Sequence, residues 1–462
     1  MASHNICPSR PGPRTIRLLE IISAPDANVL EYKFREHCLD DPLPFEALSY
    51  VWGDPTDRLE LTVEGQTVLV TVNLWCALQQ LSFRHEHPPL WVDAICINQE
   101  DLVERQEQAA LVGEIYGGAA CVMVWLGPDA DKECFEAYGL VKLIYRECGR
   151  LAQDKGCDVS TFAYRLAQTS DDKAFCEVTV SQIETAMAEA NVPASAWQCL
   201  RRLFDSRWFT RIWCVQEIGF ARSALILLGG MEPIPWEWLA VVTAWYKSHD
   251  LNNKVLPPAI DSVMYYYALY MLVGVEVDGH EGAEALIAAL WRFHPFQATD
   301  PRDKVYGLLG LLGKSGQKLP MELRYVDTSV ADVYAAAAMA LINERRDLKI
   351  LAFIHHTSEY IDADLTDGMP SWVPRWDTGP GLSSLNRNYR PGATITACGP
   401  HIYAEVSDSS PLTLEVKGLS FGQVDFVSRL IHGDLVSNLR DDVESVSVES
   451  KILRLWNGLL GH

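Results

Sequence analysis

The sequence predicts an α/β fold, with a mostly parallel sheet flanked by helices, then a mainly helical region and a small β-containing tail. Short apolar runs alternate with longer segments of helical periodicity over the first half of the chain. Strands that are separated by helices usually pair in parallel. The chain has 462 residues, 48% of them hydrophobic, which is more material than one core normally uses.

Changes in composition and in hydrophobic periodicity divide the chain into four expected parts. Residues 1–44 form an N-terminal extension and 45–232 an α/β domain, which carries a helical insertion at about 131–196. Residues 233–349 read as a helical region and 350–462 as a β-containing C-terminal region. We also expect that the chain ends in either a short C-terminal region or a truncation.

The α/β domain opens with a strand and a hairpin. The run FEALSYVW (45–52) is apolar and β-favouring and ends at a Gly-Asp-Pro turn, so it predicts a buried strand. The segment 59–70 alternates around Gly65, which predicts a hairpin. Asn73 is the expected N-cap of a helix over 74–83.

The next block repeats the alternation of strand and helix. The run LWVDAICI (90–97) predicts a strand, and the polar residues 98–101 begin a helix over 102–116 that stops at the following glycines. The run AACVMVWLG (119–127) is apolar throughout, as expected for a strand buried on both faces.

A helix from roughly Ser206 to Ala221 and the strand ALILLGG (224–230) complete the α/β domain. Helical periodicity then dominates as far as residue 347, in five separate segments: 236–249, 264–275, 283–293, 303–313 and 330–347. The tail contains β-type segments such as LTLEVKGLSF (412–421).

Charge and apolar content exclude several classes of partner. The chain carries 39 Lys and Arg against 61 Asp and Glu, a formal net charge of -22. Such a surface repels the phosphates of nucleic acids and anionic membranes, so we expect neither as a partner. We find no apolar run long enough to span a bilayer and no signal-peptide core at the start, and we expect a protein of the cytosol or nucleus, assigned here to the cytoplasm.

Neither a metal site nor a bound cofactor is expected. The 12 cysteines are scattered singly, as reduced and mostly buried thiols would be. His85 and His87 lie in a Pro-flanked loop that reads as a solvated turn. The run GLLGLLGKSG (307–316) resembles a phosphate loop, but its glycine spacing is wrong for one.

Polar residues at the ends of predicted strands are the best candidates for a site. Ligands of open α/β sheets bind where the parallel strands end. Ser49, Tyr50 and Trp52 stand at the end of the first strand, and Asp93 stands within the second. Glu217 follows Trp213 by four residues, so both should share one face of their helix.

Each of these acidic residues also has a purely structural interpretation. A buried carboxylate costs several kcal/mol unless it is paired or hydrogen-bonded. Asp93 could bind a neighbouring loop or Arg211, and Glu217 could pair with Arg207, Arg211 or Arg222. Cys96 is a nucleophile by residue type, but no histidine stands near it in the sequence.

Three long motifs in order resemble the fungal heterokaryon incompatibility (HET) domain. They are FEALSYVWGDP (45–55), LWVDAICINQEDLVERQEQ (90–108) and SRWFTRIWCVQE (206–217). Phe45 replaces the tyrosine that usually opens the pattern. The segments ATDPRDKVYGLLGL (298–311) and PSWVPRWD (370–377) are similar to stretches that commonly follow this domain.

The resemblance implies a role in non-self recognition and programmed cell death when different fungal hyphae fuse. The family is regarded as a distant relative of Toll/interleukin-1 receptor (TIR) domains, which implies a TIR-like, flavodoxin-like sheet. Some TIR domains cleave NAD with a glutamate in a Trp-x-x-x-Glu helix. By that resemblance Glu217 is catalytic, Ser49, Tyr50, Trp52, Asp93 and Trp213 bind substrate, and NAD is a substrate rather than a cofactor.

Three functions stay open at this stage. The first is an NAD glycohydrolase. The second is a non-enzymatic death or assembly scaffold that self-associates through the HET domain, with the acidic helix at 100–108 as a candidate face, and that answers to an unidentified protein activator. The third is a tailoring enzyme of secondary metabolism with an apolar pocket near Trp291, Phe293 and His294.

Overall fold

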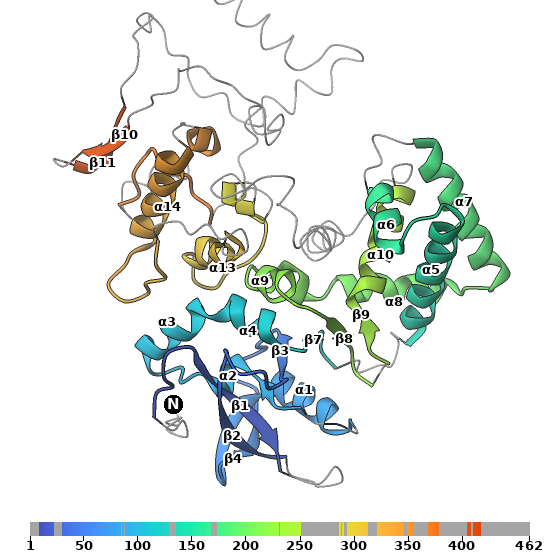
Figure 1. Cartoon of the computed structure of the whole chain (residues 1–462), viewed down its shortest axis with the longest axis horizontal. Helices are drawn as coiled ribbons and strands as arrows, with labels where there is room; N and C mark the ends of the chain where they lie inside the picture. Colours follow the sequence, from blue (N-terminus) through green and yellow to red (C-terminus); the bar gives the residue numbers. More distant parts are fainter. Residues whose placement is uncertain are drawn as a thin grey trace, which may run out of the picture.

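The computed structural model describes most of the first half of the chain and parts of the second (Figure 1). The described residues are 9–22, 30–84, 86, 88–128, 135–167, 173–230, 232–250, 286–287, 289–290, 293–312, 321–345, 349–354, 368–377, 404–407 and 410–416. A mixed sheet with helices beside it is the centre of this part, and a helical bundle and two further helices flank it.

One nine-stranded sheet has the order β5-β4-β2-β1-β6-β3-β7-β8-β9. Its strands are β1 (Thr15–Ile21), β2 (Glu31–Cys38), β3 (Glu46–Tyr50), β4 (Arg58–Val63), β5 (Gln66–Thr71), β6 (Leu90–Trp91), β7 (Cys121–Trp125), β8 (Ala224–Leu227) and β9 (Ile234–Pro235). The expected strands at 45–52, 119–127 and 224–230 are confirmed as β3, β7 and β8, and every residue of β3 is buried.

The sheet is mixed rather than mostly parallel. Its centre is parallel, because β3 pairs with β6 and β7, and β7 pairs with β8. The N-terminal strands β1 and β2 add antiparallel pairs beside β6, the hairpin β4–β5 joins β2 in parallel, and β9 runs antiparallel to β8. The hairpin cannot pair with β3, its predecessor in the chain, because β6 and β7 occupy both edges of that strand.

The hairpin forms as expected, but the helix after it begins earlier than Asn73. Glu64 and Gly65 both have positive φ, 53° and 70°, as a tight two-residue turn requires. The helix α1 spans Val72–Ser82, and Thr71 caps it. Asn73 instead donates to the Val51 carbonyl at 2.6 Å and accepts from Trp125 Nε1 at 2.9 Å, so it joins the ends of β3 and β7.

The segment expected as a strand over 90–97 is a strand only at Leu90–Trp91. A one-turn helix, α2 (Asp93–Cys96), replaces the rest, and it buries Ile95 and Cys96. The expected helix over 102–116 is also divided, into α3 (Leu102–Ala110) and α4 (Val112–Gly118), and Asp101 caps α3 by accepting from two backbone N–H groups. Both differences have the same cause. The apolar residues of this segment that face the core do not follow one continuous strand or helix periodicity.

The insertion is helical, as predicted, and consists of α5 (Phe135–Asp154), α6 (Val159–Ala167) and α7 (Lys173–Glu189). These helices pack with α8 (Ala194–Phe204) and α10 (Trp236–Asp250) into the bundle at the right of Figure 1. The expected helix over 206–221 is shorter. It is a 3-10 helix, η1 (Arg207–Thr210), followed by α9 (Cys214–Gly219), because Ile212 N donates to Gln297 O at 3.0 Å and holds the chain extended between them.

The described remainder contains α13 (Asp303–Leu312), α14 (Val330–Arg345), a 3-10 helix η3 (Lys349–Phe353) and a hairpin of β10 (Ala404–Ser407) and β11 (Ser410–Val416). The expected helix over 264–275 lies outside the described residues, as does part of that over 283–293. None of the helices described is long and apolar enough to cross a bilayer.

Two glycines let α13 pack closely on α9. A Cβ at Gly307 would touch the Ile212 side chain at 3.1 Å, and a Cβ at Gly310 would overlap the Gln216 amide. That amide is buried and donates to the Tyr306 carbonyl at 3.0 Å. The glycines at 307 and 310, which suggested a phosphate loop, therefore belong to a helix contact, whereas residues 313–316 lie outside the described part.

A buried ion pair fixes the segment that follows β6. Arg17 on β1 donates to Glu104 on α3 at 2.6 Å, and both side chains are almost inaccessible to water. Arg17 also donates to the Cys96 carbonyl at 2.9 Å, and Glu104 accepts from the Asn98 backbone N–H at 2.7 Å. The loop from α2 to α3 is therefore anchored to the sheet by charge-assisted hydrogen bonds.

Removing one partner of this pair should destabilise the protein strongly. Glu104→Ala leaves a buried guanidinium without its carboxylate, which costs about 3–5 kcal/mol. Urea unfolding followed by tryptophan fluorescence measures the loss. Glu107→Ala, on the exposed side of the same helix, should change stability by less than about 0.5 kcal/mol. Equal effects of the two substitutions would contradict the anchoring role.

The same substitution at two helical glycines should have opposite effects. Gly310→Leu overpacks the contact between α13 and α9 and should lower stability by about 1–3 kcal/mol. Gly139→Leu, on α5 with nothing within 4 Å of a built Cβ, should leave the melting temperature unchanged or raise it, because glycine disfavours helix. Equal melting temperatures for the two variants would show that α13 does not need this close approach.

Candidate functional site

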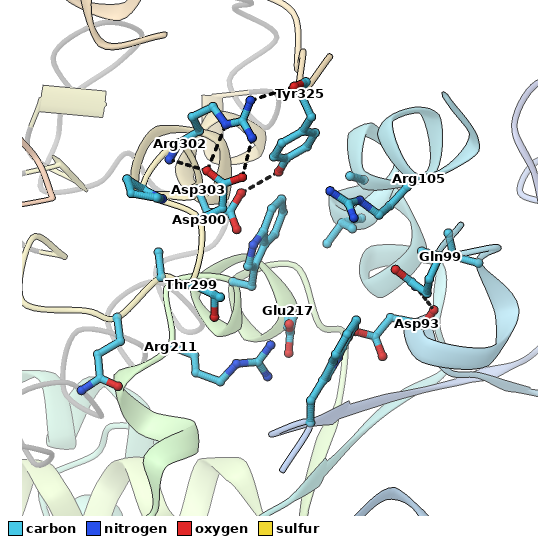
Figure 2. A pocket seen from close by; sticks show the side chains of 18 of the residues that line it. Asp93, Gln99, Arg105, Arg211, Glu217, Thr299, Asp300, Arg302, Asp303 and Tyr325 are labelled. Carbon is cyan, nitrogen blue, oxygen red and sulfur yellow. Dashed lines mark hydrogen bonds and ion pairs between the residues drawn. The ribbon is translucent and has the colours of Figure 1, made fainter. Parts of the chain in front are cut away.

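A pocket of about 1110 Å³ opens where β3 and β6 end. Its floor comes from the residues after these strands, from η1 and from α9, one wall comes from α3 and α4, and residues 297–303 and 325–330 cover it. The volume lies slightly above the range of about 300–1,000 Å³ that small-molecule sites usually have. Figure 2 shows Glu217 in the middle of the view, with Arg211 on one side and Asp93 on the other.

Glu217 lies in the floor of the pocket and is only 6% exposed. It stands one turn after Trp213, whose carbonyl accepts from the Glu217 backbone N–H at 3.2 Å, so both side chains reach the pocket. Ser49 Oγ donates to Glu217 Oε2 and accepts from Trp208 Nε1 at 2.7 Å. Because the indole can only donate, this relay fixes the direction of the serine hydroxyl toward the carboxylate.

Burial raises the pKa of Glu217, and the charge of Arg211 and the Ser49 hydrogen bond oppose that rise. Arg211 is half-buried, lines the same pocket and donates to the Tyr50 carbonyl. Its guanidinium stays charged at any pH at which the protein is folded. The carboxylate is therefore influenced by the charge of Arg211, one of the three arginines that the structural interpretation named, and it also borders open space.

Asp93 organises the mouth of the pocket. Its carboxylate accepts from Trp52 Nε1 at 2.8 Å and from its neighbouring backbone N–H at 2.7 Å. Its carbonyl accepts from Gln99 Nε2 at 2.8 Å (Figure 2). Burial raises the pKa of Asp93, and the Trp52 bond and the charge of Arg211 oppose this. Trp52 borders the pocket and is 44% exposed. Its indole ring is therefore held in place by Asp93 while much of the ring surface stays accessible.

The residues singled out from the sequence lie in two layers. Glu217, Trp213, Trp52 and Asp93 line the pocket. Ser49 and Tyr50 are buried behind them and do not line it; Ser49 holds Glu217, and the Tyr50 carbonyl holds Arg211. Burial and the nearby Asp93 charge raise the pKa of the Tyr50 hydroxyl well above its ordinary value.

The cysteine and histidine candidates lie elsewhere. Cys96 is buried outside the pocket lining, and burial raises the pKa of the Cys214 thiol well above its usual range. The described cysteines are thiols rather than disulfides, and no group of potential metal ligands occurs among the described residues. His85 and His87 lie outside the described part, as does Trp291, whereas Phe293 is buried.

Sequence reasoning missed the cover of the pocket. Arg302 forms an ion pair with Asp300 at 2.7 Å and donates to the carbonyls of Tyr325 and Thr328, both at 2.8 Å. The Tyr325 hydroxyl donates to Asp303 at 2.6 Å (Figure 2). The polar cluster Thr-Asp-Pro-Arg-Asp at 299–303, immediately before an apolar helix, was the available signal.

The cover is attached to the wall as well. The Tyr325 backbone N–H donates to Gln106 Oε1 on α3 at 3.1 Å, and the guanidinium of Arg105 lies 5.6 Å from the centre of the Tyr325 ring. Contacts of this kind join residues more than 200 positions apart in the sequence. They make the site a composite of the α/β sheet and the later helical region.

Comparisons with known proteins agree with the motifs. The family model of the heterokaryon incompatibility protein (HET) matches residues 45–217. The Neurospora crassa protein "Heterokaryon incompatibility protein 6, OR allele" is 26% identical over 426 residues, which cover 84% of this chain and 60% of that protein. This chain thus spans about three-fifths of the length of that relative. The search of solved structures gave no match.

The matched range begins just before β3 and ends on Glu217, so it encloses the strand ends and the helix that form the pocket floor. All three sequence motifs fall within it. Residues 45–217 of the chain thus match the HET family model, and most of the chain is similar to a heterokaryon incompatibility protein.

Proposed function

We propose that this protein acts in the cytoplasm in fungal non-self recognition and programmed cell death, and that its pocket cleaves NAD at the nicotinamide glycosidic bond. The family match and the name of the Neurospora relative support the first part. One observation carries the second: a buried carboxylate, Glu217, is fixed by Ser49 in the floor of a pocket that has room for a dinucleotide.

Cleavage of the glycosidic bond requires little from the protein beyond a negative charge placed beside the ribose. The bond between ribose C1′ and the nicotinamide nitrogen breaks, and its electron pair leaves with nicotinamide, which departs as a neutral base. The ribose becomes oxocarbenium-like, and the Glu217 carboxylate stabilises that positive charge. Water then attacks C1′ and loses a proton, and the products are ADP-ribose, nicotinamide and a proton.

The surroundings of Glu217 suit this role. A charge acts more strongly in a site from which water is excluded, and the charge of Arg211 opposes the rise in the pKa of Glu217 that burial causes. The exposed ring of Trp52 offers a surface on which nicotinamide or adenine can stack. The central parallel strands follow the order β6-β3-β7-β8, or second-first-third-fourth, which is the order in flavodoxin-like folds and supports a TIR-like relationship.

Self-association is the second candidate function. Leu102 and Val103 at the start of α3 are 50% and 46% exposed, an apolar pair on an otherwise polar surface helix. The candidate self-association face over 100–108 is narrower than the sequence predicts, because Glu104 and Gln108 are buried against β1. In this alternative a protein activator assembles the chain and the pocket is not needed for signalling.

Replacing the carboxylate by an amide should abolish cleavage. The concentrated full chain should release nicotinamide from NAD, measured by chromatography, and Glu217→Gln should lower the rate by at least about 100-fold, because it removes the charge that stabilises the transition state. Glu189→Gln, on the exposed end of α7, should keep the full rate. A folded Glu217→Gln protein that still kills cells on expression would favour the scaffold instead.

The pH dependence of cleavage should report the environment of Glu217. Burial raises its pKa and the Ser49 hydrogen bond opposes the rise, so Ser49→Ala should raise the pKa further. Since cleavage needs the ionised form, activity should be lost at a higher pH on the acid side than in the wild type. Plots of kcat/KM against pH test this, with Ser82→Ala, whose hydroxyl binds the Gln79 carbonyl, as a control. An acid limb that stays in place or moves to lower pH would contradict the relay.

A further inference from the structure

The acidic and basic side chains of the pocket differ in how far partners within the protein satisfy them. Four acidic residues and four arginines line it: Asp93, Glu217, Asp300 and Asp303, with Arg105, Arg207, Arg211 and Arg302. Every one of the acids accepts a side-chain hydrogen bond from within the protein, and the donors are Trp52, Ser49, Arg302 and Tyr325. The negative charges of the pocket are therefore already committed.

The arginines divide into two pairs. Arg302 is neutralised by Asp300, and Arg211 lies beside Glu217 and donates to the Tyr50 carbonyl. Arg105 and Arg207 form no ion pair and no side-chain hydrogen bond with the residues that the structure describes. The charge of Arg105 contributes to the lowered pKa of Asp300 without forming an ion pair with it. The two pocket charges that no described residue pairs are thus both positive, in a chain whose formal net charge is -22.

We propose that Arg105 and Arg207 bind the phosphate groups of the substrate, so that the pocket selects a diphosphate-bearing nucleotide over an uncharged nucleoside. A guanidinium presents parallel N–H donors that match phosphate oxygens. In an acidic protein, local positive charge is needed to bring an anion into a cleft. This inference rests on the proposed function for the identity of the site and adds the part of the substrate that is recognised.

Arg105 is prearranged for this task. Tyr325 lies between two guanidinium groups, with Arg105 at 5.6 Å and Arg302 at 5.1 Å from the ring centre. The ring is fixed by its hydroxyl on Asp303 and by its backbone N–H on Gln106. An arginine that stacks on a fixed ring loses less conformational freedom when it binds an anion.

The second arginine approaches from a different element. Arg207 is exposed at the start of η1 and borders the same pocket, whose wall on the α3 side carries Arg105 (Figure 2). Glu217 lies in the floor that they share. A ligand whose ribose reaches Glu217 can therefore place its phosphates against cationic groups from separate parts of the chain.

The test is the binding of ADP-ribose, inorganic diphosphate and nicotinamide riboside to the full chain by titration calorimetry. ADP-ribose should bind, and Arg105→Gln and Arg207→Gln should each weaken it by at least about tenfold, the usual size of a lost charged hydrogen bond. Lysine at either position should restore part of the affinity. Diphosphate should bind more weakly than ADP-ribose and depend on the same arginines, and nicotinamide riboside should be insensitive to both glutamine variants.

A variant outside the pocket serves as the control for this test. Arg201→Gln, exposed on α8 outside the pocket, should leave the affinity for ADP-ribose unchanged, and circular dichroism checks the fold of each variant. Unchanged ADP-ribose affinity in both pocket variants, or no binding of ADP-ribose by the wild type, overturns the inference. Arginine-dependent binding of ADP-ribose without any cleavage of NAD would support this inference while refuting the proposed function.

Discussion

The burial of one carboxylate beside an open pocket is the constraint on which the site depends. A glutamate removed from water costs free energy unless donors and a counter-charge are supplied. The first motif provides Ser49 and the Tyr50 carbonyl, and the last motif provides Trp208, Arg211 and Glu217 itself. The two motifs, which are far apart in the sequence, therefore form two halves of one hydrogen-bonded unit.

The pocket above that unit needs two further parts of the chain. The middle motif supplies Asp93 and Gln99, and the buried pair of Arg17 and Glu104 holds their loop to the sheet. The residues after the HET match supply the cover, because α13 packs on α9 and Tyr325 binds α3. The site is therefore larger than the segment 45–217 that carries the family motifs.

Much of the site could be predicted because it depends on local patterns. The apolar runs gave β3, β7 and β8, and the rule that ligands bind at strand ends singled out Glu217, Asp93 and Trp52, which line one pocket. The mixed sheet was not predicted, since the pairing of β1 with β6 joins distant segments. Nor could the helical turn that begins at Asp93 be separated from a strand, because the residues after Asp93 in it are apolar and suit either structure.

Arg105 and Tyr325, which sequence reasoning missed, have no local signature, and Arg207 was considered only as a partner of Glu217. An arginine on a surface helix looks the same in the sequence whether a carboxylate neutralises it or not. Its state is decided by which segments fold against it, and here these come from beyond residue 293. Only the three-dimensional arrangement shows which charges of the pocket are left for a ligand.

The central claim is that Glu217 faces the ribose of a bound dinucleotide. The most direct measurement is a crystal structure of the full chain with a non-cleavable carbocyclic analogue of NAD. The account predicts that the ring replacing the nicotinamide ribose lies within hydrogen-bond distance of the Glu217 carboxylate, in the pocket between α9 and α3. An analogue bound elsewhere, or a pocket that stays empty at saturating analogue, would contradict it.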